Sequence, residues 1–317
     1  MFIVDKAGVE KNLTMGECID LMEEILKDLA RGQAVQTLRT MTPLFDNNLL
    51  GLMPAFLPLQ KVMGAKIISV FPHNHQKKLP SHQGVVTLFD ALTGELRAIV
   101  DAEAITAIRT AAVSGAATRA LARQDANILC ILGAGVQAAT HMEAILAVRP
   151  INKAKVWSID EEEAQTFASE MESKHNISVA ACSSAREAVE GADIICTVTS
   201  SPLPVLEGAW IKPGAHINAV GACTAIVREL DAMAVALSRL YVDRRESALN
   251  EAGDILIPLS DGIISESHIV GELGDLLLKK IPGRQSEEEI TLFESLGLAV
   301  EDLAAACRII ENLELRA

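Results

Sequence analysis

Three positively charged side chains in the first third of the chain stand in otherwise apolar surroundings. Lys66 lies in the run GAKIISVFP, Arg109 lies in the small-residue run ITAIRTAAVSG, and Arg39 precedes both. A lysine on a buried strand face is rare unless it is paired or functional. Arginine binds a carboxylate through two parallel hydrogen bonds, and lysine supplies a tunable proton. Singly, each is typical of a surface or salt-bridged residue; together, they predict a site for a small carboxylate.

A polar loop, LPSHQGVV, precedes another strand-like run and contains Ser81, His82 and Gln83. Their hydroxyl, imidazole and amide groups could contact a cofactor or a substrate. A plain polar loop with a surface histidine has the same composition. The stretch alone leaves both interpretations open.

The run CILGAGVQAATHMEAI contains Gly133, Gly135 and Ala138 in a Gly-x-Gly-x-x-Ala pattern. The first glycine permits a tight turn, the second lets the backbone approach a pyrophosphate, and the alanine lets the helix pack closely on the strand. The helix N-terminus then offers free N–H groups and a positive dipole to the phosphates. A Gly-x-Gly pair alone is a weak signal, but here strand, turn, helix and second strand follow in the right order. The pattern therefore predicts a dinucleotide-binding loop.

Asp160 follows the second of these strands, in KVWSIDEEEA, at about the distance where a carboxylate binds the ribose hydroxyls of NAD. No Arg or Lys follows to accept a 2′-phosphate, and the acidic residues 161–163 would repel one. NAD(H) is therefore the preferred cofactor, and NADP(H) is the alternative. A second interpretation stays open, in which Asp160 only caps the next helix.

The elements that must position these groups differ between the two halves of the chain. Thr14 and Glu17 form a capping box, and apolar residues at helical spacing up to Gly32 predict the first helix. Short β-like runs follow at 35–41, 49–57, 64–71, 84–90 and 95–101, with the last two forming a hairpin, and an alanine-rich helix at 102–123 closes this part.

From residue 125 onward, apolar strands alternate with helical stretches. Strands are expected at 127–133, 153–159, 178–182, 193–199, 215–221 and 239–243, with helices at 136–148, 161–174, 184–190 and 227–237, and the chain ends in a strand, a turn and a long helix. Such alternation predicts a parallel sheet covered by helices on both faces. The fold class is therefore α/β, with a Rossmann dinucleotide-binding domain and an α+β substrate and dimerisation domain.

Composition narrows the class of protein further. The 317 residues are 50% hydrophobic and 22% charged, with a net charge of −14, which disfavours nucleic acid and anionic membranes as partners. The six cysteines include no Cys-x-x-Cys pair, and reduced thiols predict a cytoplasmic protein. The N-terminus lacks the pattern of a signal peptide, and no apolar run approaches membrane-spanning length.

Several stretches together resemble the ornithine cyclodeaminase/μ-crystallin family, most closely the μ-crystallin-like ketimine reductases. They are GAKIISVFP, PSHQGVVTLFDALTGELRAIVDAEAITAIRTAAVSG, LGAGVQA, ADIICTVTSS, KPGAHINAVGA, REL, LYVD and ITLFESLGLAVEDLAAA. The resemblance implies a homodimer and a substrate and dimerisation domain at 1–122 and 299–317, with the Rossmann NAD(P)-binding domain at 123–298. It also implies small α-imino or α-amino acids as substrates.

The resemblance implies roles for named residues as well. Arg39, Lys66 and Arg109 would hold the substrate carboxylate, and Lys66 would donate the proton. Cofactor contacts would fall on Ser81, His82, Arg109, Thr110, Gly133, Ala134, Gly135, Val136, Gln137, Asp160, Thr197, Val198, Thr199, Val220, Gly221, Ala222 and Ser295. His82 and Cys223 would lie next to the substrate, and no metal is expected.

Cys223 is the main departure from the cyclodeaminase pattern, because those enzymes have an aspartate at this position. A thiol with an ordinary pKa of about 8.5 is a poor substitute for a carboxylate acid/base. Reducing a preformed imine needs only a bound carboxylate, a proton and a hydride. The resemblance therefore implies an NAD(P)H-dependent reductase of small cyclic ketimines, converting Δ1-pyrroline-2-carboxylate or Δ1-piperideine-2-carboxylate to L-proline or L-pipecolate. A small, half-buried thiol that only fills space remains an equal interpretation of Cys223.

Three alternatives stay open at this point. An alanine or other open-chain amino-acid dehydrogenase would use the same residues with ammonia. Ornithine cyclodeaminase comes next, weakened by the missing aspartate. The last is a non-catalytic binder of a dinucleotide and a small molecule, which would have little need of a proton donor.

Overall fold

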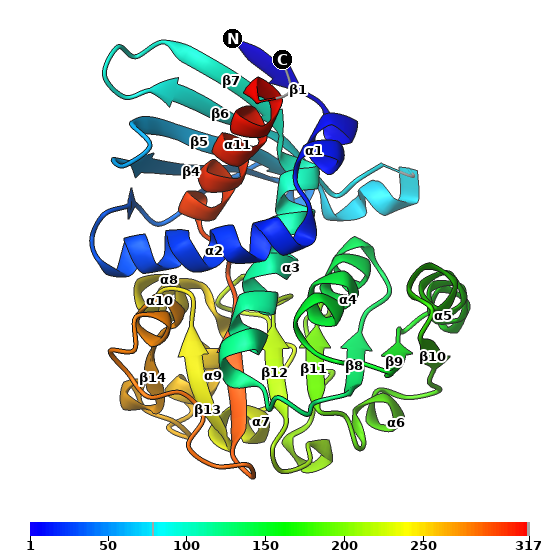
Figure 1. The fold of residues 1–317 in the computed structure, drawn as a ribbon. Helices are drawn as coiled ribbons and strands as arrows, with labels where there is room; N and C mark the ends of the chain where they lie inside the picture. Colours follow the sequence, from blue (N-terminus) through cyan, green and yellow to red (C-terminus); the bar gives the residue numbers. More distant parts are fainter. Residues whose placement is uncertain (78, 316–317) are drawn as a thin grey trace. The chain divides into compact units, whose positions relative to one another are not determined.

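The computed structural model describes residues 1–77 and 79–315, and the side chains of these residues except 75 and 76 (Figure 1). Within these residues the chain divides into unit 1, Met1–Thr110 with Gly297–Ala317, and unit 2, Ala111–Leu296. Helix α3 (Ala102–Leu121) contributes its first half to unit 1 and its second half to unit 2. The predicted domain limits at 122/123 and 298/299 stay a prediction.

Unit 1 is built on a mixed sheet. Its strands, in spatial order, are β1 (Phe2–Val4), β7 (Leu96–Asp101), β6 (His82–Asp90), β5 (Val62–Val70), β4 (Leu49–Leu57) and β2 (Val35–Gln36), with β3 (Thr40–Pro43) also pairing with β4. β1 pairs with β7 in parallel, and the pairs from β7 through to β2 are antiparallel. The predicted hairpin of β6 and β7 is confirmed.

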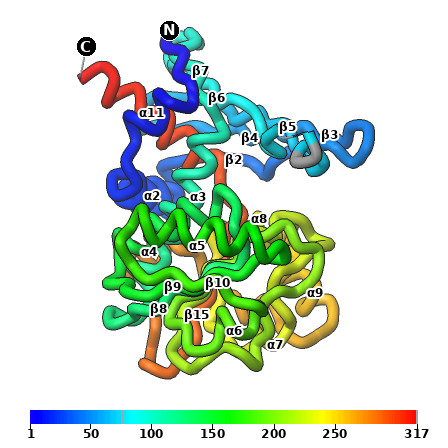
Figure 2. Tube along the Cα trace, turned by 90° about the vertical axis from the view of Figure 1, so that its right-hand side faces the viewer, coloured from blue at the N-terminus to red at the C-terminus, as the bar shows by residue number. Residues whose placement is uncertain are grey.

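Helices cover one face of this sheet. The long C-terminal helix α11 (Ala299–Glu314) packs on β4, β5 and β6 and contacts α2 (Met15–Ala30), which lies far from it in the sequence (Figures 1 and 2). Helix α1 (Lys6–Asn12) contacts β7 and α11. Thr14 caps α2 as predicted, since its hydroxyl accepts a hydrogen bond from the Glu17 N–H. Because side chains alternate along a strand, every second residue of β4 and β5 faces α11.

Unit 2 contains a parallel sheet of the predicted kind. The spatial order is β10 (Ser178–Ala181), β9 (Lys153–Trp157), β8 (Ile128–Leu132), β11 (Ile194–Thr197), β12 (His216–Ala219), β15 (Ile290–Glu294), β13 (Ser238–Val242) and β14 (Ile269–Glu272). Every neighbouring pair in this order is parallel. The α/β class with a Rossmann-type unit is thus confirmed.

The first three helices of unit 2 along the sequence agree with the prediction, and the later helices differ from it. α4 (Val136–Val148), α5 (Glu161–His175) and α6 (Ala185–Val189) lie where they were expected. The helix predicted at 227–237 is wrong in its start: α7 spans only Ala232–Ala236, because the Asp231 carboxylate caps it by accepting the Ala234 N–H. The sequence pattern missed β14 and three helices, α8 (Arg245–Glu251), α9 (Gly253–Ser260) and α10 (Leu273–Leu277).

Short 3₁₀ turns complete the described chain at Phe45–Asn47, Pro72–Lys77, Gly208–Trp210 and Glu266–His268. None of the helices in residues 1–77 and 79–315 has the length and apolar character needed to cross a membrane. Over the same residues, no group of three or more His, Cys, Asp or Glu side chains could hold a metal ion.

Candidate active site

Lys66 is the most buried of the predicted cations, with only 2% of its surface exposed. It lies on β5, on the same face as Val62 and Ile68, toward α11. Its Nζ is 2.8 Å from Asp302 Oδ2 and donates a longer bond of 3.4 Å to the Thr106 hydroxyl. A buried charge needs such a partner, because leaving water costs several kcal/mol per ion.

Arg109 contacts the other oxygen of the Asp302 carboxylate. Its Nε donates to Asp302 Oδ1 at 2.9 Å, and its Nη1 donates to Glu301 Oε2 at 3.0 Å. Gly297 makes room for the guanidinium, because a Cβ at that residue would collide with Arg109 Nη1. The Gly297 carbonyl accepts a 3.2 Å hydrogen bond from Arg39 Nη2. Structure therefore brings the three predicted cations of unit 1 into one cluster.

The acidic partners of the cluster lie in the first turn of α11. Asp302 and Glu301 are both fully buried; both pair with Arg109, and Asp302 also pairs with Lys66. Lysine and arginine side chains held in this way are groups that bind a carboxylate. Burial lowers the pKa of the Lys66 ammonium to about 8, with Asp302 opposing the fall and Arg109 adding to it. At neutral pH Lys66 is therefore protonated, yet close enough to its pKa to give up the proton.

The polar residues predicted in a loop lie differently: Ser81 precedes β6, whereas His82 and Gln83 are the exposed first residues of that strand. Ser81 Oγ and His82 Nδ1 share a hydrogen bond of 2.9 Å. Partial desolvation, and then the Lys66 charge, lower the pKa of the exposed His82 imidazole below its usual value. His82 therefore lies within the electrostatic reach of Lys66. Thr110, next to Arg109 on α3, is buried.

The glycine-rich turn of unit 2 has the geometry that its sequence predicts. Gly133 has φ +120°, and a Cβ there would lie 2.9 Å from the Val198 carbonyl oxygen, so only glycine fits this turn. Nothing lies within 4 Å of a Cβ built on Gly135, which is the N-cap of α4 and has no side-chain cap. Ala138 is fully buried against the sheet. An uncapped helix N-terminus behind an open glycine fits a pyrophosphate.

Asp160 caps α5, as the second interpretation of the sequence proposed. Its Oδ1 accepts the N–H groups of Glu162 and Glu163 at 2.9 and 3.1 Å. The residue is exposed at the end of β9. Capping does not compete with ribose binding, since a carboxylate has two oxygens and accepts several hydrogen bonds. The ribose role stays a prediction.

The remaining predicted cofactor contacts follow the strand ends β11, β12 and β15. Thr197–Thr199 follow or end β11, Val220–Ala222 follow β12, and Ser295 follows β15. The buried Ser295 hydroxyl has no hydrogen-bond partner among the described residues, so it is available to a ligand. Cys223 is half-buried, and its Sγ donates to the Val220 carbonyl at 3.3 Å.

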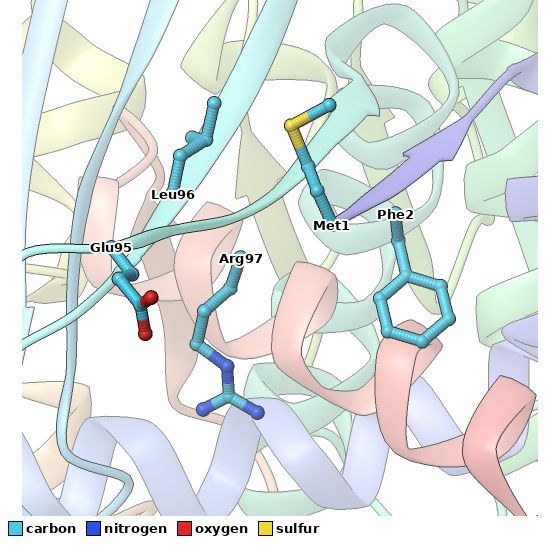
Figure 3. A pocket seen from close by; sticks show the side chains of 5 residues that line it. All are labelled: Met1, Phe2, Glu95, Leu96 and Arg97. Carbon is cyan, nitrogen blue, oxygen red and sulfur yellow. The ribbon is translucent and has the colours of Figure 1, made fainter.

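A surface pocket of unit 1 lies apart from these residues. Met1 and Phe2 line it together with Glu95, Leu96 and Arg97 (Figure 3). None of the predicted site residues belongs to its lining, so the pocket plays no part in the site described above.

The sequence patterns did not single out the buried acidic residues, either in the cation cluster of unit 1 or in the loops of unit 2. No motif singled out Glu301 and Asp302, and their shared partner Arg109 lies almost 200 positions away in the sequence. Glu229 was placed inside a predicted helix, but it is a fully buried residue of a loop. The one usable signal was their position inside apolar stretches, where a charged residue needs a partner.

A Rossmann-type dinucleotide turn in one unit and a buried cation cluster in the other define the class as a two-unit NAD(P)-dependent oxidoreductase. The family model for the ornithine cyclodeaminase/mu-crystallin family matches residues 2–316. This chain belongs to the ornithine cyclodeaminase/mu-crystallin family, which confirms the resemblance seen in the sequence motifs.

Three known proteins illustrate the similarity. The ketimine reductase mu-crystallin of Mus musculus is 42% identical over 89% of this chain and 86% of its own length. The Δ1-pyrroline-2-carboxylate reductase of Thermococcus litoralis, solved with NADH and L-proline, is 40% identical with a TM-score of 0.97 and covers 100% of this chain and 98% of its own. An archaeal alanine dehydrogenase dimer with bound NAD is 32% identical with a TM-score of 0.93, covering 99% and 97%.

Proposed function

We propose that this protein is an NAD(H)-dependent reductase of small cyclic ketimine carboxylates, with Δ1-pyrroline-2-carboxylate and Δ1-piperideine-2-carboxylate as substrates and L-proline and L-pipecolate as products. One observation supports it most: Asp302 holds Lys66 and Arg109 together in a buried cluster. Relatives named as ketimine reductase and Δ1-pyrroline-2-carboxylate reductase support the same reaction.

Each group of the cluster has a defined task in this proposal. Arg39 and Arg109 bind the substrate carboxylate, and Lys66, protonated below a pKa of about 8, gives its proton to the imine nitrogen. A reduced nicotinamide supplies the hydride that the imine carbon accepts. The C=N bond thereby becomes a C–N single bond with one added hydrogen on each atom, and Lys66 recovers its proton from water.

NAD(H) is the preferred cofactor in this proposal. Asp160 and the acidic residues that follow it leave no positive charge for a 2′-phosphate, and the two solved relatives compared above bind NADH or NAD. NADP(H) is the alternative. Comparing the dissociation constants of NADH and NADPH tests the choice, and tighter binding of NADPH would contradict it.

A homodimer in the cytoplasm is the proposed state of the protein. The sheet face of unit 1 that α11 does not cover exposes Leu50, Leu52, Phe56, Met63 and Ile67, of which Leu52 pairs with Ile67 and Phe56 with Met63 across β4 and β5. Apolar patches of this kind are typical of protein interfaces. The cysteines are free thiols, as in reducing compartments. Light scattering should give twice the chain mass; a monomer at micromolar concentration would contradict the dimer.

The test of function is NADH oxidation with Δ1-pyrroline-2-carboxylate. We expect saturable turnover with it, and much weaker turnover with pyruvate plus ammonia. Faster turnover with pyruvate and ammonia would replace the proposal with an alanine dehydrogenase. Proline formation from ornithine with catalytic NAD would replace it with a cyclodeaminase. Binding of both ligands without any turnover would leave only a binding protein.

A further inference from the structure

Two loops of unit 2 lie where the second half of a bound dinucleotide belongs. In the strand order, β9 and β10 lie on one side of β8, and β11 and β12 lie on the other. A dinucleotide spans such a switch point, with one nucleotide over each side. Since Asp160 follows β9, the adenosine half falls on that side, and the nicotinamide half falls on the loops after β11 and β12. The first of these loops contacts the glycine turn, because the Val198 carbonyl packs against Gly133.

The Glu229 carboxylate joins these two loops. Its Oε1 accepts both the N–H and the hydroxyl of Thr199 at 2.6 Å, and its Oε2 accepts the N–H of Gly221 at 2.7 Å. Thr199 belongs to the loop after β11, and Gly221 belongs to the loop after β12. Glu229 itself is fully buried. The Glu229 side chain therefore sets the separation of these two loop backbones. The strand order assigns both loops to the nicotinamide half of the cofactor.

The space around Gly221 is too small for any side chain at that residue. A Cβ on Gly221 would lie 2.5 Å from Glu229 Oε2 and would collide with the Thr199 carbonyl. The three groups that hydrogen-bond the carboxylate are all donors, and a side chain with two acceptor oxygens satisfies them all. A glutamine would turn its NH₂ group toward one of the donors and push that loop away.

Asp254 holds Glu229 in turn. Its Oδ1 accepts the N–H groups of Glu229 and Leu230 at 2.9 and 2.7 Å from the buried start of α9. The backbone under Glu229 is thereby fixed by a second carboxylate. This support explains why a segment without helix or strand structure can carry a side chain with three well-formed hydrogen bonds.

We propose that Glu229 is a positioning residue for the nicotinamide half of the cofactor, which it serves by locking the loops of Thr199 and Gly221 together. The inference rests on the dinucleotide binding contained in the proposed function. It assigns no substrate contact to Glu229. Glu229 therefore affects binding of the nicotinamide half of the cofactor and not binding of the adenosine half.

The test compares two ligands on one variant. Titrating Glu229→Gln with NADH and with ADP-ribose, which lacks the nicotinamide, should show NADH binding weakened about tenfold or more and ADP-ribose binding unchanged within about twofold. The matched control is Glu170→Gln, an exposed glutamate of α5, which should bind both ligands as wild type does. Unchanged NADH binding, or an equal loss of both ligands, would overturn the inference.

A milder variant covers the case in which Glu229→Gln does not fold. Thr199→Val removes the hydroxyl, which donates to Glu229 and accepts the Ser201 N–H, and keeps the Thr199 backbone N–H. It should weaken NADH by about threefold and leave ADP-ribose unchanged, and the absence of this selectivity would overturn the inference. Both measurements are of binding alone. Missing ketimine turnover would therefore defeat the proposed reaction without affecting this result.

Discussion

Two groups of buried carboxylates, one in each unit, are stabilised in opposite ways. In unit 1, Asp302 and Glu301 are paired with the cations Lys66 and Arg109 at 2.8–3.0 Å. In unit 2, Glu229 and Asp254 are held by backbone N–H groups and a hydroxyl, and neither oxygen of the buried Glu294 has a hydrogen-bond partner among the described residues. Buried acidic residues are thus part of ion pairs in the first group, whereas Glu294 of the second group favours the protonated form.

Protonation follows from this difference. Burial, together with the neighbouring carboxylates Asp243, Asp254 and Glu229, raises the pKa of Glu294 well above its ordinary value. Burial likewise raises the pKa of Asp254 to about 8. Of these two carboxyl groups Glu294 holds the proton, because Asp254 accepts two backbone N–H groups and Glu294 accepts none in the described chain. The carboxylates of the first group are therefore ion-paired, and the Glu294 carboxyl of the second group is neutral.

Removing the lysine should have the largest effect. Lys66→Met deletes the proton donor, so ketimine turnover should fall about 100- to 10,000-fold while NADH binding stays normal. Steady-state rates and NADH fluorescence measure the two effects. Lys11→Met, at an exposed residue of α1, serves as the control and should retain wild-type rates. Near-normal turnover of Lys66→Met would remove the lysine from the reaction.

The ion pair itself is tested by Asp302→Asn. Without this negative charge the pKa of Lys66 falls below about 8, because Asp302 is the main group that raises it. The wild-type kcat/KM should decline above about pH 8, and the variant should decline at lower pH, so that its activity at pH 8 is about tenfold lower. The exposed Glu314→Gln on the same helix is the control. An unchanged pH profile would show that Asp302 does not act on Lys66.

Glu294→Gln should stabilise the protein, in contrast to Asp302→Asn. Because the folded pKa of Glu294 is raised, its contribution to stability is present below its unfolded pKa of about 4.5 and is lost as pH rises toward the folded pKa. The neutral variant should therefore gain about 1–3 kcal/mol at pH 8 and almost nothing near pH 4.5. Asp302→Asn should instead lose about 3–5 kcal/mol.

Urea unfolding at the two pH values measures the difference between Glu294→Gln and wild type. The exposed Glu288→Gln is the matched control and should follow wild type at both. A variant less stable than wild type at pH 8 would mean that Glu294 is ionised and partnered, and the contrast between the two units would fail.

Cys223→Ser should have the smallest effect. The thiol donates to the Val220 carbonyl at 3.3 Å and to the Leu296 carbonyl at a long 4.0 Å, bonds that a hydroxyl can replace. Ketimine turnover should stay within about threefold of wild type. A loss of turnover comparable with that of Lys66→Met would give the thiol a chemical role.

Much of the scaffold could be predicted from the sequence, because buried parallel strands are short apolar runs. The strands from β8 to β12 and helix α4 lie within a residue or two of their expected limits. Lys66 could be singled out because a charge on a buried strand face is anomalous. Its partner could not, because Asp302 belongs to a helix whose packing on β5 is a tertiary contact. Glu229 was missed because apolar spacing from Val227 suggested a helix, whereas Asp231 starts that helix four residues later.

The most direct measurement follows a labelled hydride. Protein with Δ1-pyrroline-2-carboxylate and NADH carrying two deuteriums at the nicotinamide C4 should yield L-proline with one deuterium at Cα, detected by mass spectrometry, and Lys66→Met should yield almost none. Deuterium-free proline, or no proline from protein that binds both ligands, would contradict the account.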